Sequence, residues 1–376
     1  MKNDNFVLEQ YLDELEELVN IDSGSTYVEG VNKIADIFKE KYENLGFLVK
    51  EHNFSKDAGS CLEIRNKDGK DIDILIIGHM DTVFKKGTAA ERPFTIKGDR
   101  AYGPGVADMK SGLLSTYYSM KLLNKEVLDK LNICIFHNSD EEISSIYSQE
   151  KIKELARKSR YAFVMEPGRS DGSMVTERKG LAKYFIDFHG VAAHAGVEPE
   201  KGKSAIHELG NWIVNLVKLN DYESGTSVNI GVVEGGTVPN VVADKAHGQI
   251  DIRFKSDNVI DDIEKAMQEL KENPLVEGID IKVERKGYRP PMNPNEDVYK
   301  LCRQIEKIGE ELGIEIKWTA TGGGSDANFT SAEGVPSIDS MGPIGGGAHG
   351  VDEYIEIDSI EPRIKLFTRL LENLAD

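Results

Sequence analysis

Apolar positions in the first third of the chain form two kinds of pattern, which alternate along the sequence. Over residues 7–19 and 31–45 they recur every three or four positions, which predicts two amphipathic helices. Residues 72–77 and 131–136 are instead almost continuous apolar runs, as expected of strands that are buried on both faces. A helical run over residues 113–123 lies between them. This alternation predicts an α/β domain with a mostly parallel sheet covered by helices.

The pattern changes near residue 180. The expected order is a strand, a helix, two strands, a helix and a strand, over residues 181–188, 204–219, 227–233, 248–254, 259–270 and 279–284. This β-α-β-β-α-β order is the split ferredoxin-like unit. Because a helix (298–312) and an apolar strand (337–341) follow it, we predict an α+β domain at residues 180–290, inserted into a first domain formed by residues 1–179 and 291–376.

The acidic composition excludes some classes of partner. The chain has 376 residues, more than one hydrophobic core usually serves, and 65 acidic against 46 basic residues give a formal charge of -19. Such a charge repels nucleic acid and anionic membrane surfaces, so we expect neither as a partner. No stretch has the apolar length of a membrane span, and the three cysteines have no C-x-x-C spacing, which predicts reduced core thiols in the cytoplasm.

Side chains that bind metals or protons gather where apolar runs end. They are His79 and Asp81, Glu141 and Glu142, and Glu166, with Asp108 and His349 in glycine-rich loops. The carboxyl ends of the strands in an open α/β sheet share one crevice, so residues far apart in the sequence can meet there. These nitrogen and oxygen donors suit a pair of Zn²⁺ ions bridged by a carboxylate and a water, and Co²⁺ or Mn²⁺ can substitute.

Taken singly, these signals have structural alternatives, except Glu166, because a buried carboxylate without a partner would be costly. His79-x-Asp81 is also typical of a polar strand end capped by an Asx turn, although strand spacing lets Asp81 hold one imidazole nitrogen. Asp108 precedes a helical run and suits an N-cap. Glu142 has capping-box spacing to Ser139, so the acidic segment also suits a helix start. The joint order of the signals favours the metal site.

Six segments together resemble a known family. They are Gly78–Val83, Gly103–Lys110, Asp140–Glu142, Met165–Pro167, His194–Gly196 and Gly322–Asp326. In their order, and over almost the whole chain, they resemble the di-zinc metallopeptidase family of glutamate carboxypeptidase, aminoacylase and succinyl-diaminopimelate desuccinylase. The resemblance implies a catalytic domain at residues 1–179 and 291–376, a lid and dimerisation domain at residues 180–290, and hence a homodimer.

The resemblance also implies which residues bind metal. Asp108 would bridge two zinc ions, His79 and Glu166 would complete one site, and Glu142 and His349 would complete the other. The peptide bond after Asp108 is expected to be cis, as is common in the family.

Catalytic roles follow from the same resemblance. Glu141 would be the general base and Asp81 would orient His79. His194, from its own or the partner subunit, would stabilise the oxyanion.

Three residues of the inserted domain match family positions that hold the terminal carboxylate of the substrate. They are Asn240, Arg253 and Arg289. The arginine fork suits bidentate capture of a carboxylate. The alternatives are a salt-bridged strand residue for Arg253 and a solvated hinge for Arg289.

The function that the resemblance implies is hydrolysis of the amide bond of a C-terminal amino acid, in a small peptide or an N-acyl amino acid, by a metal-bridging water with Glu141 as base. Glu166 favours this carboxypeptidase or aminoacylase type, because the aminopeptidase branch tends to have aspartate there. A tripeptide aminopeptidase is one alternative, and a non-catalytic peptide-binding relative is another. Glu141 argues against the second, since a binding protein needs no base.

Overall fold

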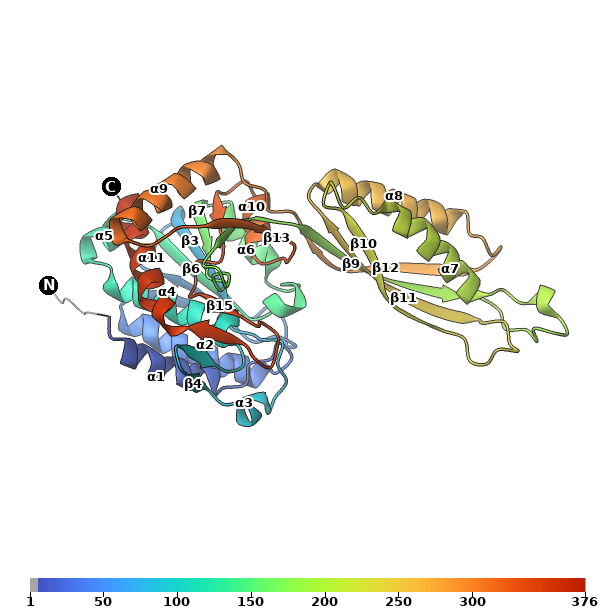
Figure 1. The fold of residues 1–376 in the computed structure, drawn as a ribbon, viewed down its shortest axis with the longest axis horizontal. Helices are drawn as coiled ribbons and strands as arrows, with labels where there is room; N and C mark the ends of the chain where they lie inside the picture. The colour runs from blue at the N-terminus through green and yellow to red at the C-terminus, as the bar shows by residue number, and fades with distance from the viewer. Residues whose placement is uncertain (1–5, 376) are drawn as a thin grey trace. The chain divides into compact units, whose positions relative to one another are not determined.

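The computed structural model describes residues 6–375, which form two compact units (Figure 1). The first unit contains the described residues up to Glu177, Asn293–Ala320 and those from Ser325 on. The second contains Arg178–Met292 with Thr321–Gly324, so it interrupts the sequence of the first. No helix among residues 6–375 is long and apolar enough to cross a membrane.

A six-stranded sheet forms the centre of the first unit. In spatial order its strands are β1 (Leu48–His52), β2 (Cys61–Arg65), β6 (Ile133–Asn138), β3 (Ile72–His79), β7 (Ser159–Val164) and β14 (Ser337–Ile338). β6, β3, β7 and β14 are parallel neighbours, whereas β1 and β2 pair antiparallel at one edge. The predicted mostly parallel sheet is therefore confirmed, and the carboxyl ends of its parallel strands share one edge.

Helices bury this sheet. The main ones are α1 (Leu8–Val19), α2 (Val28–Asn44), α4 (Ser111–Leu122), α5 (Lys125–Lys130), α6 (Gln149–Ala156), α9 (Glu296–Leu312), α10 (Ala327–Ala332) and α11 (Ile360–Leu374). α4 contacts α1, α11 and β3, and its residues from Ser111 to Met120 are all buried. Ile74–Ile77 of β3 are buried as well, as expected for a strand that is covered on both faces.

Short elements complete the first unit. They are α3 (Thr88–Glu91), a sheet of β15 (Gly345–Gly346), β16 (Tyr354–Glu356), β5 (Arg100–Tyr102) and β4 (Thr95–Lys97), and a pair of β13 (Trp318–Thr321) and β8 (Met174–Arg178), whose last residues belong to the second unit. The strand expected over residues 337–341 is limited to Ser337–Ile338.

The second unit has the predicted order β9 (Gly180–His189), α7 (Ala205–Leu216), β10 (Ser227–Gly235), β11 (Lys245–Phe254), α8 (Asp257–Glu272) and β12 (Asp280–Arg289). Its strands form an antiparallel sheet in the order β10-β11-β9-β12, which is the ferredoxin-like arrangement. α7 and α8 cover one face of this sheet (Figure 1). Trp212, Phe188 and Phe254 belong to a core separate from that of the first unit.

Strand β12 is longer than the apolar pattern predicted. It continues to Arg289, and a register shift lies between Arg285 and Gly287. Arg289 is paired with Leu181 of β9 and is buried. The solvated-hinge alternative for Arg289 is therefore wrong.

His137 of β6 makes the stability of the first unit depend on pH. It is buried against the rings of Phe38 and Tyr42, and burial lowers its pKa to about 3. The unfolded chain therefore binds a proton that the folded chain does not, between an unfolded pKa of about 6.5 and the folded value. Over that window we expect this residue to lower the free energy of unfolding by as much as about 1.4 kcal/mol for each pH unit of acidification.

The measurement is urea unfolding of the parent and of His137→Leu at several pH values between neutral and acidic. The variant should lose less stability than the parent as the pH falls. His207→Leu, on the exposed surface of α7, is the control and should follow the parent. Parallel pH dependences for the parent and His137→Leu would contradict the expectation.

Candidate metal centre

His79, the last residue of β3, is buried at the carboxyl edge of the sheet. Its Nδ1 lies 2.9 Å from the main-chain oxygen of Asp81 and 3.5 Å from the Oδ1 of the same residue. Its Nε2 lies 2.9 Å from Oδ1 of Asp108. One ring nitrogen is thus held by the chain that follows β3, and the other points into a cluster of carboxylates.

Asp108 lies between two imidazoles. Its Oδ1 faces His79, and its Oδ2 lies 3.3 Å from Nε2 of His349. It belongs to the irregular turn Val106–Lys110 that precedes α4, and the Asp108–Met109 peptide bond is cis, as predicted. Because α4 begins at Ser111 with Lys110 as its N-cap, the N-cap alternative for Asp108 is wrong.

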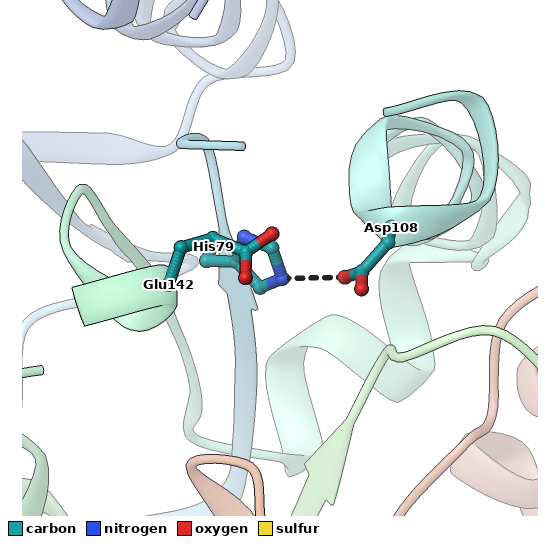
Figure 2. Close-up of side chains that lie close together, drawn as sticks. All are labelled: His79, Asp108 and Glu142. Carbon is teal, nitrogen blue, oxygen red and sulfur yellow. Dashed lines mark hydrogen bonds and ion pairs between the residues drawn. The ribbon is translucent and has the colours of Figure 1, made fainter. Parts of the chain in front are cut away.

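Two further carboxylates complete the cluster, one on each side of Asp108. Glu166, which follows β7, places Oε1 3.6 Å from Nε2 of His79. Glu142, which follows β6, places Oε2 3.2 Å from Nε2 of His349. Figure 2 shows His79, Asp108 and Glu142 turned toward one another from three separate segments. The five residues therefore form two groups of three that share Asp108.

The charges of the cluster are strongly coupled. Burial, and then the charge of Asp108, raise the pKa of Glu166 well above its usual range. Burial also raises the pKa of Glu142. Hydrogen bonds that His349 donates to the carboxylates of Asp108 and Glu142 raise the pKa of its imidazole to about 10. Buried carboxylates at this density attract positive charge, as protons on the imidazoles or as metal ions.

Glu141 and Glu142 form a short 3₁₀ turn, Glu141–Ile143, rather than the start of an α-helix. The carboxylate of Asp81 accepts the N–H groups of Glu141 (3.1 Å) and Glu142 (3.2 Å) and the hydroxyl of Ser25 (2.6 Å). Asp81 therefore holds this turn as well as lying beside His79. The hydroxyl of Ser139 donates to the main-chain oxygen of Gly59 instead, so the capping-box alternative is wrong.

Two buried aspartates hold the segment after this turn, and neither was assigned a role from the sequence. Asp140 accepts the N–H groups of Tyr147 and Ser148, and burial raises its pKa to about 6. Asp326 accepts hydrogen bonds from the side chains of Asn138 and Ser145. The only signal for Asp326 was its place in the Gly322–Asp326 segment.

The other predicted site residues lie in the second unit. His194 is exposed, with Nδ1 accepting the N–H of Gly196, and exposed Asn240 accepts the N–H of Ala195 on its main-chain oxygen. Arg253 forms a salt bridge with Asp251, as expected if it is a salt-bridged strand residue. Its Nε and Nη2 lie 2.7 and 3.0 Å from the carboxylate oxygens of Asp251. Its Nη1 also donates to the main-chain oxygen of Gly322.

These residues divide between the two ends of the second sheet. Arg253 and Arg289 lie on either side of Leu181, near the start of β9, whereas His194 follows the end of β9 at His189. The strand from Leu181 to His189 spans roughly 27 Å at ~3.4 Å per residue. Asn240 lies beside His194, because its main-chain oxygen accepts the N–H of Ala195. One copy of this unit therefore cannot bring His194 or Asn240 to the same small molecule as the two arginines, and the predicted grouping of Asn240 with Arg253 and Arg289 is not met within one copy.

The contacts of Asp81 predict an energetic coupling with Ser25. Asp81→Asn replaces one acceptor oxygen by an NH₂ group, so one buried N–H or O–H group loses its partner, at about 1–3 kcal/mol of unfolding free energy. Ser25→Ala should cost less, about 0.5–1.5 kcal/mol. Because the two residues share one hydrogen bond, the double variant should lose less than the sum of the two.

Urea unfolding of the four proteins in the presence of a chelator measures this coupling as a double-mutant cycle. Ser55→Ala serves as the control for the Ser→Ala step, since it removes a hydroxyl of a half-buried residue that accepts only the nearby N–H of Asp57 among the hydrogen bonds described. Additive losses would show that the Ser25–Asp81 contact does not contribute.

Comparison with known proteins identifies the family. Residues 75–373 match peptidase family M20/M25/M40. The chain is 32% identical to carboxypeptidase G2 of Pseudomonas sp. (strain RS-16), over 100% of this chain and 93% of that protein. It is 26% identical to a succinyl-diaminopimelate desuccinylase of Hydrogenovibrio crunogenus, over 91% and 92% of the two chains.

Solved structures agree with this assignment. Aminopeptidase PepT from Bacillus cereus superimposes with a TM-score of 0.77 at 25% identity, over 98% of this chain and 99% of that chain. The fold is also that of an M20 family metallo-carboxypeptidase from Sulfolobus solfataricus, with a TM-score of 0.76 at 20% identity over 97% and 99% of the two chains. The chain therefore belongs to peptidase family M20/M25/M40 and is a hydrolytic enzyme.

Proposed function

We propose that this enzyme is a zinc-dependent hydrolase that cleaves the amide bond of a C-terminal amino acid or of an N-acyl amino acid. The observation that carries the proposal is the pair of His and carboxylate groups on either side of Asp108. The similarity to carboxypeptidase G2 over the whole chain favours this type of substrate.

The donor set fits two metal ions. His79 and Glu166 would hold one, Glu142 and His349 the other, with Asp108 shared between them. Nitrogen and oxygen donors without thiolates suit Zn²⁺, and Co²⁺ or Mn²⁺ as substitutes. Glu142 also has a buried Oε1 without a hydrogen-bond partner among the described residues, which a cation would satisfy. When bound, such ions lower the pKa of water and polarise an amide carbonyl.

Glu141 is the general base in this proposal. Its N–H is fixed by Asp81, and its charge contributes to the raised pKa of Glu166, so its side chain lies near the ligands. The carboxylate takes a proton from the attacking water and delivers it to the amine nitrogen as the carbon–nitrogen bond breaks. The products are a carboxylate and a free amine.

The substrate's own carboxylate needs cationic partners. Arg253 and Arg289, at one end of the second sheet, are the proposed partners in a small peptide or N-acyl amino acid. His194, at the other end, is the proposed oxyanion donor, with Asn240 close to it in the structure. Because the two pairs lie at opposite ends of one unit, we propose that His194 and Asn240 act in the site of a partner subunit.

A homodimer would place His194 and Asn240 of one subunit in the site of the other. An apolar surface on the second unit supports the proposal of a homodimer. β10 is an edge strand with exposed Val232 and Val233. The adjacent helix α7 exposes Ile206 and Val214 with Gly210 between them, at helical spacing on one face. An edge strand and an apolar helix stripe are the elements that pair across a two-fold axis.

The proposed compartment is the cytoplasm. Cys61, Cys134 and Cys302 are free and buried. Unpaired thiols of this kind are typical of proteins in reducing compartments.

Glu141→Ala tests the mechanism. The variant should keep the zinc content of the parent, because Glu141 is not among the five proposed ligands, while kcat falls about 100-fold or more with the loss of the base. Turnover is measured on a panel of N-acyl amino acids, dipeptides with acidic C-terminal residues and tripeptides, after loading with zinc and metal analysis.

Glu142→Ala is the matched control, since the neighbouring carboxylate is a proposed ligand and its loss should lower metal content. Full activity of metal-loaded Glu141→Ala would refute the role of the base. Cleavage of tripeptides at the amino end alone would favour an aminopeptidase, the second candidate, which the similarity to PepT supports. A metal-loaded parent without turnover on any member would refute the proposed reaction.

Val214→Glu tests the dimer. A charge on the apolar stripe of α7 should shift the mass in light scattering from dimer to monomer, and activity should fall in parallel if His194 acts in the partner's site. Val351→Glu, at an exposed apolar position of the first unit, is the control and should remain dimeric. A parent protein that is monomeric throughout the assay range would contradict the proposal.

A further inference from the structure

Glu353 is a buried carboxylate that is bound by the main chain next to Asp108. It is 1% exposed. Its Oε2 accepts the N–H of Gly105 (3.0 Å), and its Oε1 accepts the N–H groups of Ala107 (2.9 Å) and Asp108 (3.0 Å). Because a buried carboxylate is costly without such donors, these contacts fix the carboxylate and the turn against each other.

The turn that Glu353 binds departs from helical geometry at Asp108. Gly105 has a φ of 73°, and Asp108 and Met109 have non-helical dihedral angles. The N–H groups of Gly105, Ala107 and Asp108 converge on one carboxylate and thereby define the direction in which the Asp108 side chain leaves the main chain. That direction decides whether Asp108 reaches both His79 and His349.

Glu353 is also the last residue of the loop that carries His349. His349 is exposed and has a φ of 66°, and the N–H of Gly350 donates to the main-chain oxygen of Gly347 in a tight turn. Beyond Glu353, β16 pairs with β5 from Tyr354 on. Glu353 is thus the buried anchor at the base of an otherwise exposed loop.

We propose that Glu353 is a positioning residue of the metal centre. Glu353 lies at the end of the loop that carries His349 and binds the turn that carries Asp108, and it thereby sets the distance between these two residues. It touches neither metal nor substrate. The inference rests on the proposed function in one respect, namely that metal ions bind to Asp108 and His349.

Glu353→Gln tests the inference through metal affinity rather than activity. The amide keeps the size of the side chain but presents an NH₂ group to at least one main-chain N–H, so the turn should move. Zinc affinity, measured by competition with a chelator, should fall about 10- to 100-fold, the range found when a residue that holds a metal ligand is changed. The absorption spectrum of the Co²⁺-loaded protein should change as well.

Glu208→Gln is the matched control. Glu208 is fully buried in the second unit and accepts the N–H of Val276 (2.8 Å) and an amide hydrogen of Asn211 (3.1 Å). This variant loses a similar buried carboxylate and a similar amount of stability. A merely structural role would lower the melting temperature in both variants and leave zinc affinity unchanged in both.

The outcomes separate the two proposals. A parent that binds zinc tightly and a Glu353→Gln variant with the same affinity would overturn the role of Glu353 and leave the proposed function standing. A parent that binds no zinc would overturn both. If Glu353→Gln does not fold, Glu353→Asp replaces it, since the shorter carboxylate cannot reach all three N–H groups; affinity equal to that of the parent would then overturn the inference.

Discussion

The shared position of the Asp108 carboxylate, between the imidazoles of His79 and His349, is the constraint on which the rest of the first unit depends. His79 is fixed because it ends a buried central strand, whereas His349 lies in an exposed loop. One carboxylate can serve both only if its own turn is held in a single conformation. Many of the hydrogen bonds around the carboxyl edge of the sheet hold the turn that carries Asp108 or the turn that carries Glu142.

Gathering carboxylates at one sheet edge is costly, and main-chain N–H groups offset much of that cost. Asp81, Asp140 and Glu353 each accept at least two of them. Such bonds favour the charged form of a carboxylate but add no net positive charge. A lysine or arginine in the same place would compete with a metal ion for the ligands, so main-chain donors preserve the field that draws cations to Asp108.

The pattern of apolar runs was sufficient to predict the main sheet of each unit and the meeting of the strand-end residues, but not the small sheets β15-β16-β5-β4 and β13-β8. His79 ends β3, and Glu142 and Glu166 follow β6 and β7. Because these three strands are parallel neighbours, their carboxyl ends lie together. Asp108 and His349 needed the resemblance to a family as well, because the loops that carry them have no periodicity. Glu353 carried no signal, since its partner Asp108 lies 245 positions away in the sequence and only loop packing joins them.

The spatial separation of His194 from Arg253 and Arg289 can be predicted from the sequence, but only by working out which strand ends are neighbours in a ferredoxin-like sheet. In an antiparallel ferredoxin-like sheet the end of β11 lies beside the start of β9, so Arg253 must lie near residue 181. His194 follows the opposite end of β9. A site that uses both ends cannot be assembled from one copy of this unit. The proposed roles of His194, Arg253 and Arg289 therefore support the proposed dimer more strongly than the apolar surface of α7 and β10 does.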